Sequence, residues 1–78
     1  MLKFEKVNND DNSVSYLYFP EGREPSGKIT INKNDGTVVE QIVAKSDEFK
    51  RYFFHMYEKI EEFIENNQFE EKGTIMWY

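Results

Sequence analysis

The chain of 78 residues has room for one small domain, which we expect to extend over residues 1–78. It contains no cysteine and a single histidine, which excludes disulfides, cysteine nucleophiles and metal sites built from thiolates or several histidines. Aromatic residues make up 17% of the chain, a proportion typical of a folded protein, and the net charge of -5 argues against binding to nucleic acid or an anionic membrane.

The first two predicted strands are separated by a polar turn. Residues 2–7 alternate apolar and charged side chains, and the polar run over residues 8–13 indicates the turn. Residues 14–19 form the second strand, which ends at Pro20 because proline lacks the N–H that a sheet requires. This strand is apolar on both faces, with Val14, Tyr16 and Tyr18 on one face and Leu17 and Phe19 on the other.

A hairpin is predicted next. Residues 28–33 alternate with period two, so that Ile29 and Ile31 point inward. Asn-Asp-Gly at residues 34–36 is a turn signal, and residues 37–44 return as the fourth strand. A two-residue loop and a three-residue loop with a bulge predict opposite faces for this strand, so the inward pair is either Val38 and Ile42 or Val39 and Val43.

A helix and a last strand are predicted in the second half of the chain. Ser46 is the expected N-cap of the helix. Residues 74–78 follow Gly73 and have the β-branched and aromatic composition of a strand. Between them, apolar side chains recur at helical spacing until the pattern stops near Asn66, namely Phe49, Tyr52, Phe53, Met56, Ile60, Phe63 and Ile64.

These elements predict an α+β fold of the order ββββαβ. One helix cannot form a core alone, so we expect its apolar stripe to cover one face of an antiparallel sheet of four to five strands and to leave the other face bare. Short connections favour the strand order 5-1-2-3-4, with the last strand antiparallel to the first. The alternative is a last strand that pairs in parallel beside the fourth.

No residue pattern in the chain indicates an enzyme, and we expect no catalytic, cofactor-binding or metal-binding residue. His55 is predicted on the solvent side of the helix, between two basic residues that would not hold it as a general base. The loop over residues 20–27 lacks the glycine spacing of phosphate-binding loops. Four carboxylates lie on the outer face of the predicted helix, where a basic partner would relieve their repulsion, namely Glu58, Glu61, Glu62 and Glu65.

The chain has more aromatic residues than one helix can cover. Phe54 falls outside the apolar stripe of the helix, and Tyr16 and Tyr18 are expected on the bare face of the sheet. Exposed aromatic patches mark interaction sites. We therefore expect an interaction surface that combines these three aromatic residues with the four glutamates of the helix.

Two segments resemble those of a known group of proteins. Residues 18–22 read Tyr-Phe-Pro-Glu-Gly, and residues 73–78 read Gly-Thr-Ile-Met-Trp-Tyr. With the turn at Gly36, they are similar to small uncharacterised bacterial proteins that share an aromatic-Pro-Glu-Gly loop and a C-terminal Gly-x-aliphatic-x-Trp-Tyr strand. The resemblance implies no activity. The Pro-Glu-Gly loop also resembles that of single-stranded-DNA-binding transcriptional coactivators, from which we carry over no binding residue.

The sequence predicts a cytoplasmic, non-enzymatic module that acts by contact with another protein, as a homodimer or as an inhibitor or immunity-type partner. The first six residues lack the apolar stretch of a signal peptide, and no apolar run approaches the ~20 residues of a membrane span. The alternative function is binding of single-stranded nucleic acid on the bare face of the sheet, where Tyr16 and Tyr18 would stack on bases beside Lys28.

Overall fold

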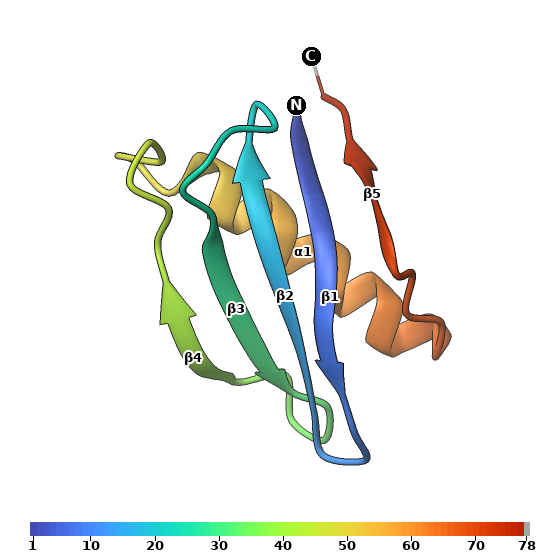
Figure 1. Cartoon of the computed structure of the whole chain (residues 1–78). Coiled ribbons are helices and arrows are strands. Elements are labelled where there is room, and N and C mark those ends of the chain that lie inside the picture. Colours follow the sequence, from blue (N-terminus) through green and yellow to red (C-terminus); the bar gives the residue numbers. More distant parts are fainter. Residues whose placement is uncertain (78) are drawn as a thin grey trace.

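The computed structural model describes residues 1–77, and its elements follow the predicted order ββββαβ (Figure 1). All strand pairs are antiparallel, and the sheet has the order β4-β3-β2-β1-β5. The predicted fold class and strand order are therefore confirmed, and the last strand pairs with the first rather than with the fourth. The elements are β1 (Leu2–Asn9), β2 (Ser13–Pro20), β3 (Gly27–Asn32), β4 (Val38–Ile42), α1 (Arg51–Asn66) and β5 (Lys72–Ile75).

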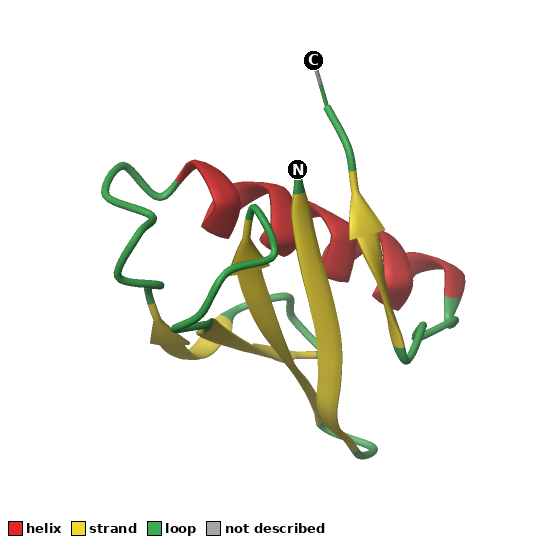
Figure 2. Cartoon of the chain, turned by 45° about the horizontal axis from the view of Figure 1, so that its top comes forward, coloured by secondary structure: helices red, strands yellow, loops and turns green. Residues whose placement is uncertain are grey.

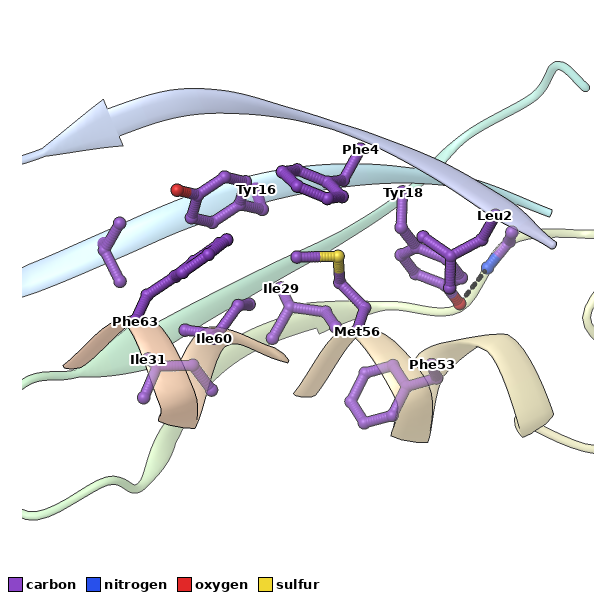
Figure 3. Close-up of a cluster of buried hydrophobic side chains, with 12 residues drawn as sticks. Leu2, Phe4, Tyr16, Tyr18, Ile29, Ile31, Phe53, Met56, Ile60 and Phe63 are labelled. Atoms are coloured by element: carbon purple, nitrogen blue, oxygen red, sulfur yellow. Dashed lines mark hydrogen bonds between the residues drawn. The ribbon is translucent and has the colours of Figure 1, made fainter. Parts of the chain in front are cut away.

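The helix α1 lies across one face of the sheet (Figure 2). It contacts β2 and β3, and its buried residues Phe53, Met56, Ile60 and Phe63 recur at the spacing that brings side chains to one side of a helix. The opposing face of the sheet supplies alternate residues of β1, β2 and β3 (Figure 3), which are Leu2, Phe4, Val14, Tyr16, Tyr18, Ile29 and Ile31. No helix among residues 1–77 is both long and apolar enough to cross a membrane.

The strand β2 presents the opposite face to the core from the one predicted. Tyr16 pairs with Ile29, and directly opposite residues of an antiparallel pair share a face. Tyr16 and Tyr18 therefore point under α1 and are fully buried, whereas Leu17 and Phe19 lie half-buried on the bare face. The prediction that these two tyrosines are exposed was wrong, because a strand apolar on both faces does not show by itself which face is covered.

The hairpin between β3 and β4 has a longer loop than either predicted alternative. The loop covers residues 33–37, and Gly36 within it adopts a φ of 73°, as a turn glycine can. A bulge follows at the start of β4, because Ile31 pairs with Val38 and Thr30 pairs with Glu40. Val38 consequently shares the covered face of the sheet, while Glu40 and Ile42 share the bare face with Thr30 and Lys28.

The helix begins later than predicted. Its first residue is Arg51, and Ser46 lies in the turns that precede it. Lys50 adopts the left-handed region with a φ of 58°, which separates these turns from the helix. Phe49, which the apolar pattern assigned to the buried stripe, consequently stands before the helix and is 76% exposed.

Asp47 takes the capping role that was predicted for Ser46. The Asp47 carboxylate accepts hydrogen bonds from the backbone N–H groups of Tyr52 at 3.1 Å and of Phe53 at 2.9 Å. These N–H groups belong to the first turn of α1 and have no partner within the helix. A buried side chain from the preceding turn thus fixes where the helix begins. The last strand is also shifted toward the N-terminus relative to residues 74–78, and Tyr78 lies outside the described residues.

Candidate interaction surface

A buried polar network joins the start of α1 to the sheet. The hydroxyl of Tyr18 donates to the Asp47 carboxylate at 3.1 Å and accepts from the backbone N–H of Ala44 at 2.9 Å, the contact drawn in Figure 3. Burial, followed by the nearby Asp47 charge, raises the pKa of Tyr18 above its ordinary value, so this hydroxyl stays protonated. Among residues 1–77, every buried side-chain nitrogen or oxygen has a hydrogen-bond partner. The network holds the start of α1 against β2 and against the segment that follows β4.

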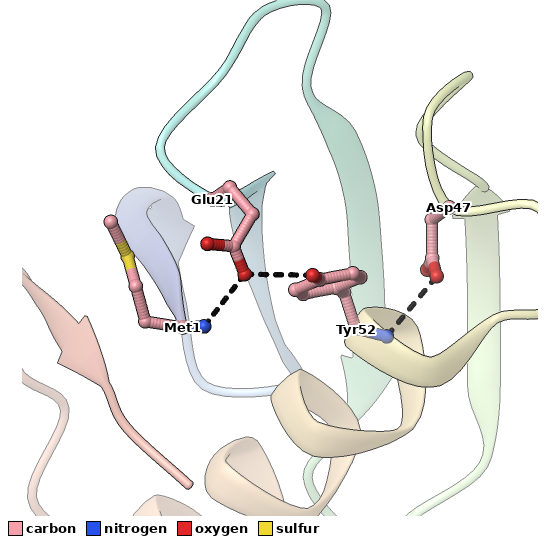
Figure 4. A network of polar contacts seen from close by, with 4 residues as sticks. All are labelled: Met1, Glu21, Asp47 and Tyr52. Atoms are coloured by element: carbon pink, nitrogen blue, oxygen red, sulfur yellow. Dashed lines mark hydrogen bonds and ion pairs between the residues drawn. The ribbon is translucent and has the colours of Figure 1, made fainter. Parts of the chain in front are cut away.

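A second polar network lies at the surface. The amino group of Met1 contacts the Glu21 carboxylate at 2.8 Å, and the hydroxyl of Tyr52 donates to the same oxygen at 2.7 Å (Figure 4). The hydrogen bond from this amino group, followed by that from Tyr52, lowers the pKa of the Glu21 carboxyl. These contacts attach the loop after β2 to the helix, and the carboxylate remains exposed.

His55 has a partner that the sequence did not reveal. Its ring stacks on Trp77 with 3.8 Å between the ring centroids, and Trp77 also makes an edge contact with Tyr52. The face of the imidazole is therefore covered, and His55 is half-buried. Within the described residues, no three histidine, cysteine, aspartate or glutamate side chains lie together as metal ligands.

The bare face of the sheet carries one ion pair and one pair of hydroxyls, beside the aliphatic and aromatic side chains of Leu17, Phe19 and Ile42. Lys28 forms an ion pair with Glu40 at 3.1 Å, which lowers the pKa of the Glu40 carboxyl, and the hydroxyls of Ser15 and Thr30 are 2.7 Å apart. The tyrosines predicted to stack on nucleic-acid bases lie under the helix instead. Tyr16 and Tyr18 therefore do not form the exposed surface that the prediction of single-stranded nucleic-acid binding required.

The two edges of the sheet differ in character. The edge strand β5 has four residues and contains Lys72 and Gly73, features that discourage pairing with another strand. The edge strand β4 has five residues, all of them exposed, and includes neither lysine nor proline. Its aliphatic side chains remain accessible, with Val39 62% exposed and Ile42 53% exposed. Of the two edges, β4 is the one open to a further strand.

Phe54 extends this apolar edge onto the helix. It is 55% exposed, in agreement with its predicted place outside the buried stripe. Tyr57 lies one turn later on the same side of α1, and its hydroxyl donates to the Gly36 carbonyl in the β3–β4 loop at 3.1 Å. Phe54 therefore lies on the side of the helix that faces β4. We call Val38, Val39, Ile42 and Phe54 the β4 surface.

The four predicted glutamates divide into two groups. Glu62 lies toward the other side of α1, where it pairs with Lys59 at 3.3 Å. The remaining three follow Phe54 and Tyr57 at helical spacing, and we call Glu58, Glu61 and Glu65 the acidic flank. Within the described residues, no side chain of the acidic flank forms an ion pair. Burial, followed by the charge of Glu61, raises the pKa of Tyr57.

The β4 surface includes residues that sequence reasoning missed. The predicted surface contained Phe54 and the glutamates but no residue of the fourth strand. A signal was present, because in a four-strand meander followed by a returning helix the fourth strand lies at an edge. The Val-Val-Glu-Gln-Ile sequence of β4 puts three aliphatic residues on that edge.

Comparisons of the chain with protein-family models, with curated proteins and with solved structures gave no match. The β4 surface and the acidic flank are therefore the features from which a function can be argued.

Proposed function

We propose that this protein is a non-enzymatic interaction module that binds another protein through the β4 surface. The observation that carries the proposal is the exposed edge strand, on which Val39 and Ile42 are accessible, with Phe54 exposed on the side of α1 that faces the β3–β4 hairpin. A strand paired on one side only keeps unpaired backbone N–H and C=O groups on its other side, and these pair readily with an extended segment of another chain. The aliphatic side chains and Phe54 would add burial of apolar surface to this pairing.

The proposal includes a location in the cytoplasm. Small domains that work outside the cell commonly depend on disulfides, because their cores are too small to supply enough stability. This chain has no cysteine and relies on a core of buried aromatic and aliphatic residues. That composition supports a reducing compartment as the place where the contact forms.

The test compares variants of the β4 surface with a matched variant elsewhere. Val39→Lys places a charge on the edge strand, and Phe54→Ser removes the exposed ring. Val7→Lys is the control, because Val7 is 54% exposed and, like Val39, lies at a bulge, but on β1 inside the sheet. Each variant is used for affinity capture from native extract of the source cells, with quantitative mass spectrometry, after its far-ultraviolet spectrum has been matched to wild type.

We expect at least one protein to be captured by the wild type and the Val7 variant and lost with both variants of the β4 surface. A partner captured equally by all four proteins would contradict the proposed surface. Absence of any protein that distinguishes them would contradict the proposed function.

A further inference from the structure

We infer that the stack of His55 on Trp77 is a proton-sensitive contact, which holds the end of β5 on the molecule more firmly when the histidine is charged. The two ring planes are inclined by 16°, and their centroids are 3.8 Å apart. One ring belongs to α1 and the other to the segment that follows β5, so the stack joins two elements of the fold. The inference goes beyond the proposed function, because neither ring belongs to the β4 surface.

The strand β5 depends on contacts made before and after it. It has four residues and pairs only with β1. Before the strand, the Glu70 carbonyl accepts a hydrogen bond from the hydroxyl of Tyr16. After the strand, Trp77 stacks on His55 and makes an edge contact with Tyr52. Loss of the Trp77 contact would release one end of β5, and so short an edge strand opens locally from a released end.

The stack differs in strength between the two charge states of the histidine. A histidine side chain gains or loses its charge between about pH 5 and 8. A neutral imidazole contacts the indole through dispersion. An imidazolium over the face of a tryptophan is also attracted by the negative potential of that face, which shifts an equilibrium about two- to fivefold at an exposed site. The charged form of His55 should therefore favour the formed stack over the broken one.

The charged side chains near His55 on α1 do not produce this difference. Arg51 and Lys59 lie one turn before and one turn after His55 and oppose its positive charge, whereas Glu58 lies three residues later and favours it. All three belong to the same helix as the histidine, so they act on it whether the stack is formed or broken. The difference between the two states comes from Trp77, and only a difference between states can shift their populations.

The other neighbour of the indole keeps its charge state between pH 5 and 8. The hydroxyl of Tyr52 donates to the Glu21 carboxylate at 2.7 Å, and this hydrogen bond raises the pKa of Tyr52. The hydrogen bonds from the amino group of Met1 and from Tyr52 lower the pKa of the Glu21 carboxyl. Tyr52 therefore stays neutral and Glu21 stays charged, so neither switches the contact in this range.

Hydrogen exchange of the β5 amides that face β1 tests the effect on the strand. Protection is measured by NMR at about pH 5 and about pH 7.5, and each value is corrected for the intrinsic exchange rate at that pH. In the wild type we expect about threefold greater protection at the lower pH. The control is His55→Phe, which keeps an aromatic ring against Trp77 and cannot be charged, and its protection should change about 1.5-fold or less. The amides of β2 give the pH dependence of the whole domain.

A double-mutant cycle measures the contact itself. The variants are His55→Ala, Trp77→Ala and the pair together, and urea unfolding gives the coupling between the two side chains at each pH. Expressed as an equilibrium constant, the coupling should be about threefold larger at pH 5 than at pH 7.5. The chain has one histidine and one tryptophan, so no second pair of this kind contributes.

Three results would overturn the inference. A coupling of equal size at both pH values would identify a stack without sensitivity to protons. A coupling that is larger at pH 7.5 would reverse the expected sign. Protection of the β5 amides that Trp77→Ala leaves unchanged would show that the stack does not hold this strand. None of these results bears on the β4 surface, so the proposed function is tested separately.

Discussion

At the scale of the residue, two buried polar side chains hold α1 and the segment that follows it against the sheet. The Asp47 carboxylate is 2% exposed and accepts hydrogen bonds from the first turn of α1 and from the hydroxyl of Tyr18. The hydroxyl of Tyr16 donates to the Glu70 carbonyl at 2.6 Å. A tyrosine can be fully buried when its hydroxyl finds such a partner, because the polar group is then not left unsatisfied.

Replacement of Asp47 tests its capping role. Asp47→Ala removes the cap of α1 and leaves the hydroxyl of Tyr18 without its acceptor, so we expect the free energy of unfolding to fall by about 2–4 kcal/mol. The neighbouring, exposed Glu48→Ala is the control, with an expected change of about 0.5 kcal/mol or less. Urea unfolding followed by circular dichroism measures both. A loss below about 1 kcal/mol for Asp47→Ala would contradict the assigned role.

The stability of the protein should fall steeply at alkaline pH. Burial raises the pKa of Tyr16 and Tyr18 above the ordinary value of 10.0. Above pH 10 the unfolded chain therefore loses these protons while the folded protein keeps them. The stabilisation is complete below this pH and is lost as the pH rises through the folded-state pKa. Each tyrosine should lower the free energy of unfolding by about 1.4 kcal/mol per pH unit in this window.

Phenylalanine variants provide the measurement for this prediction. Tyr16→Phe and Tyr18→Phe each remove one ionising group, so the free energy of unfolding should decline with a shallower slope above pH 10 than in the wild type. Only the slopes are compared, because each variant also loses a hydrogen bond at neutral pH. Equal slopes in all three proteins would show that these hydroxyls do not govern the alkaline transition.

At the scale of the element, α1 is buried on one side and exposed to solvent on the other. Phe53 is 3% exposed and makes an edge contact with the ring of Tyr18, whereas the next residue, Phe54, points away from the core. Because successive residues of a helix are rotated by about 100°, one element can hold the core with one face and offer an interaction surface with its flank.

This adjacent pair gives a matched test of the helix orientation. Phe53→Ala should lower the free energy of unfolding by about 3–5 kcal/mol, because it leaves a cavity between α1 and β2. Phe54→Ala removes the same atoms from an exposed position and should cost about 1 kcal/mol or less. Chemical denaturation of both variants measures the two losses in the free energy of unfolding. Similar losses for the two would mean that the helix faces are wrongly assigned.

The pairing of β2 with β3 depends on a glycine opposite Tyr18. A Cβ atom on Gly27 would lie 2.1 Å from the ring of Tyr18 and 2.7 Å from the backbone oxygen of Ile42. The ring cannot move aside freely, because its hydroxyl is held by Asp47 and the backbone of Ala44.

We expect Gly27→Ala to destabilise the protein by about 2–3 kcal/mol through this overlap. Gly36→Ala is the comparison, since a Cβ there meets no atom within 4 Å and the cost comes from its positive φ alone, at about 1 kcal/mol. Thermal and urea unfolding of both variants tests this order. A Gly27 variant as stable as wild type would contradict the close packing of Tyr18.

At the scale of the whole molecule, one helix covers one side of a five-stranded sheet and leaves three different surfaces. The bare face pairs Lys28 with Glu40, the edge at β5 is short, and the edge at β4 is exposed and carries three aliphatic residues. A net charge of -5 on so small a domain opposes contact between copies and favours a partner of opposite charge. The proposed function places the contact with such a partner at β4.

We expect the protein to sediment as a monomer at about 100 μM in moderate salt, because two copies that each carry a net charge of -5 repel each other. Analytical ultracentrifugation over a range of concentrations measures this directly. Raising the salt concentration should permit only weak association, and Val39→Lys should reduce it further. A stable dimer at moderate salt would show that charge repulsion does not protect this edge.

About half of the proposed interaction surface was predictable from the sequence. Helical spacing placed Phe54 outside the buried stripe and the glutamates on the outer face, because these positions depend only on the geometry of one helix. Val39 and Ile42 could not be assigned, because the faces of β4 depend on a five-residue loop and a bulge that local turn signals did not specify. The separation of Glu62 from the other three glutamates was recognised only from the ion pair of Glu62 with Lys59 and from the contact of Tyr57 with Gly36.

By itself, the sequence determined the number and type of elements and their ββββαβ order, and it favoured the last strand beside the first over the alternative beside the fourth, which the structure decided. These follow from local periodicity and from short connections, which act between residues close together in the chain. Only the tertiary structure decided which face of β2 is buried, where α1 begins and what covers His55. Each depends on a contact between distant residues: Tyr16 with Ile29, Tyr18 with Asp47, and His55 with Trp77. Such contacts form only when the whole sheet and helix have assembled, so a local sequence pattern cannot predict them.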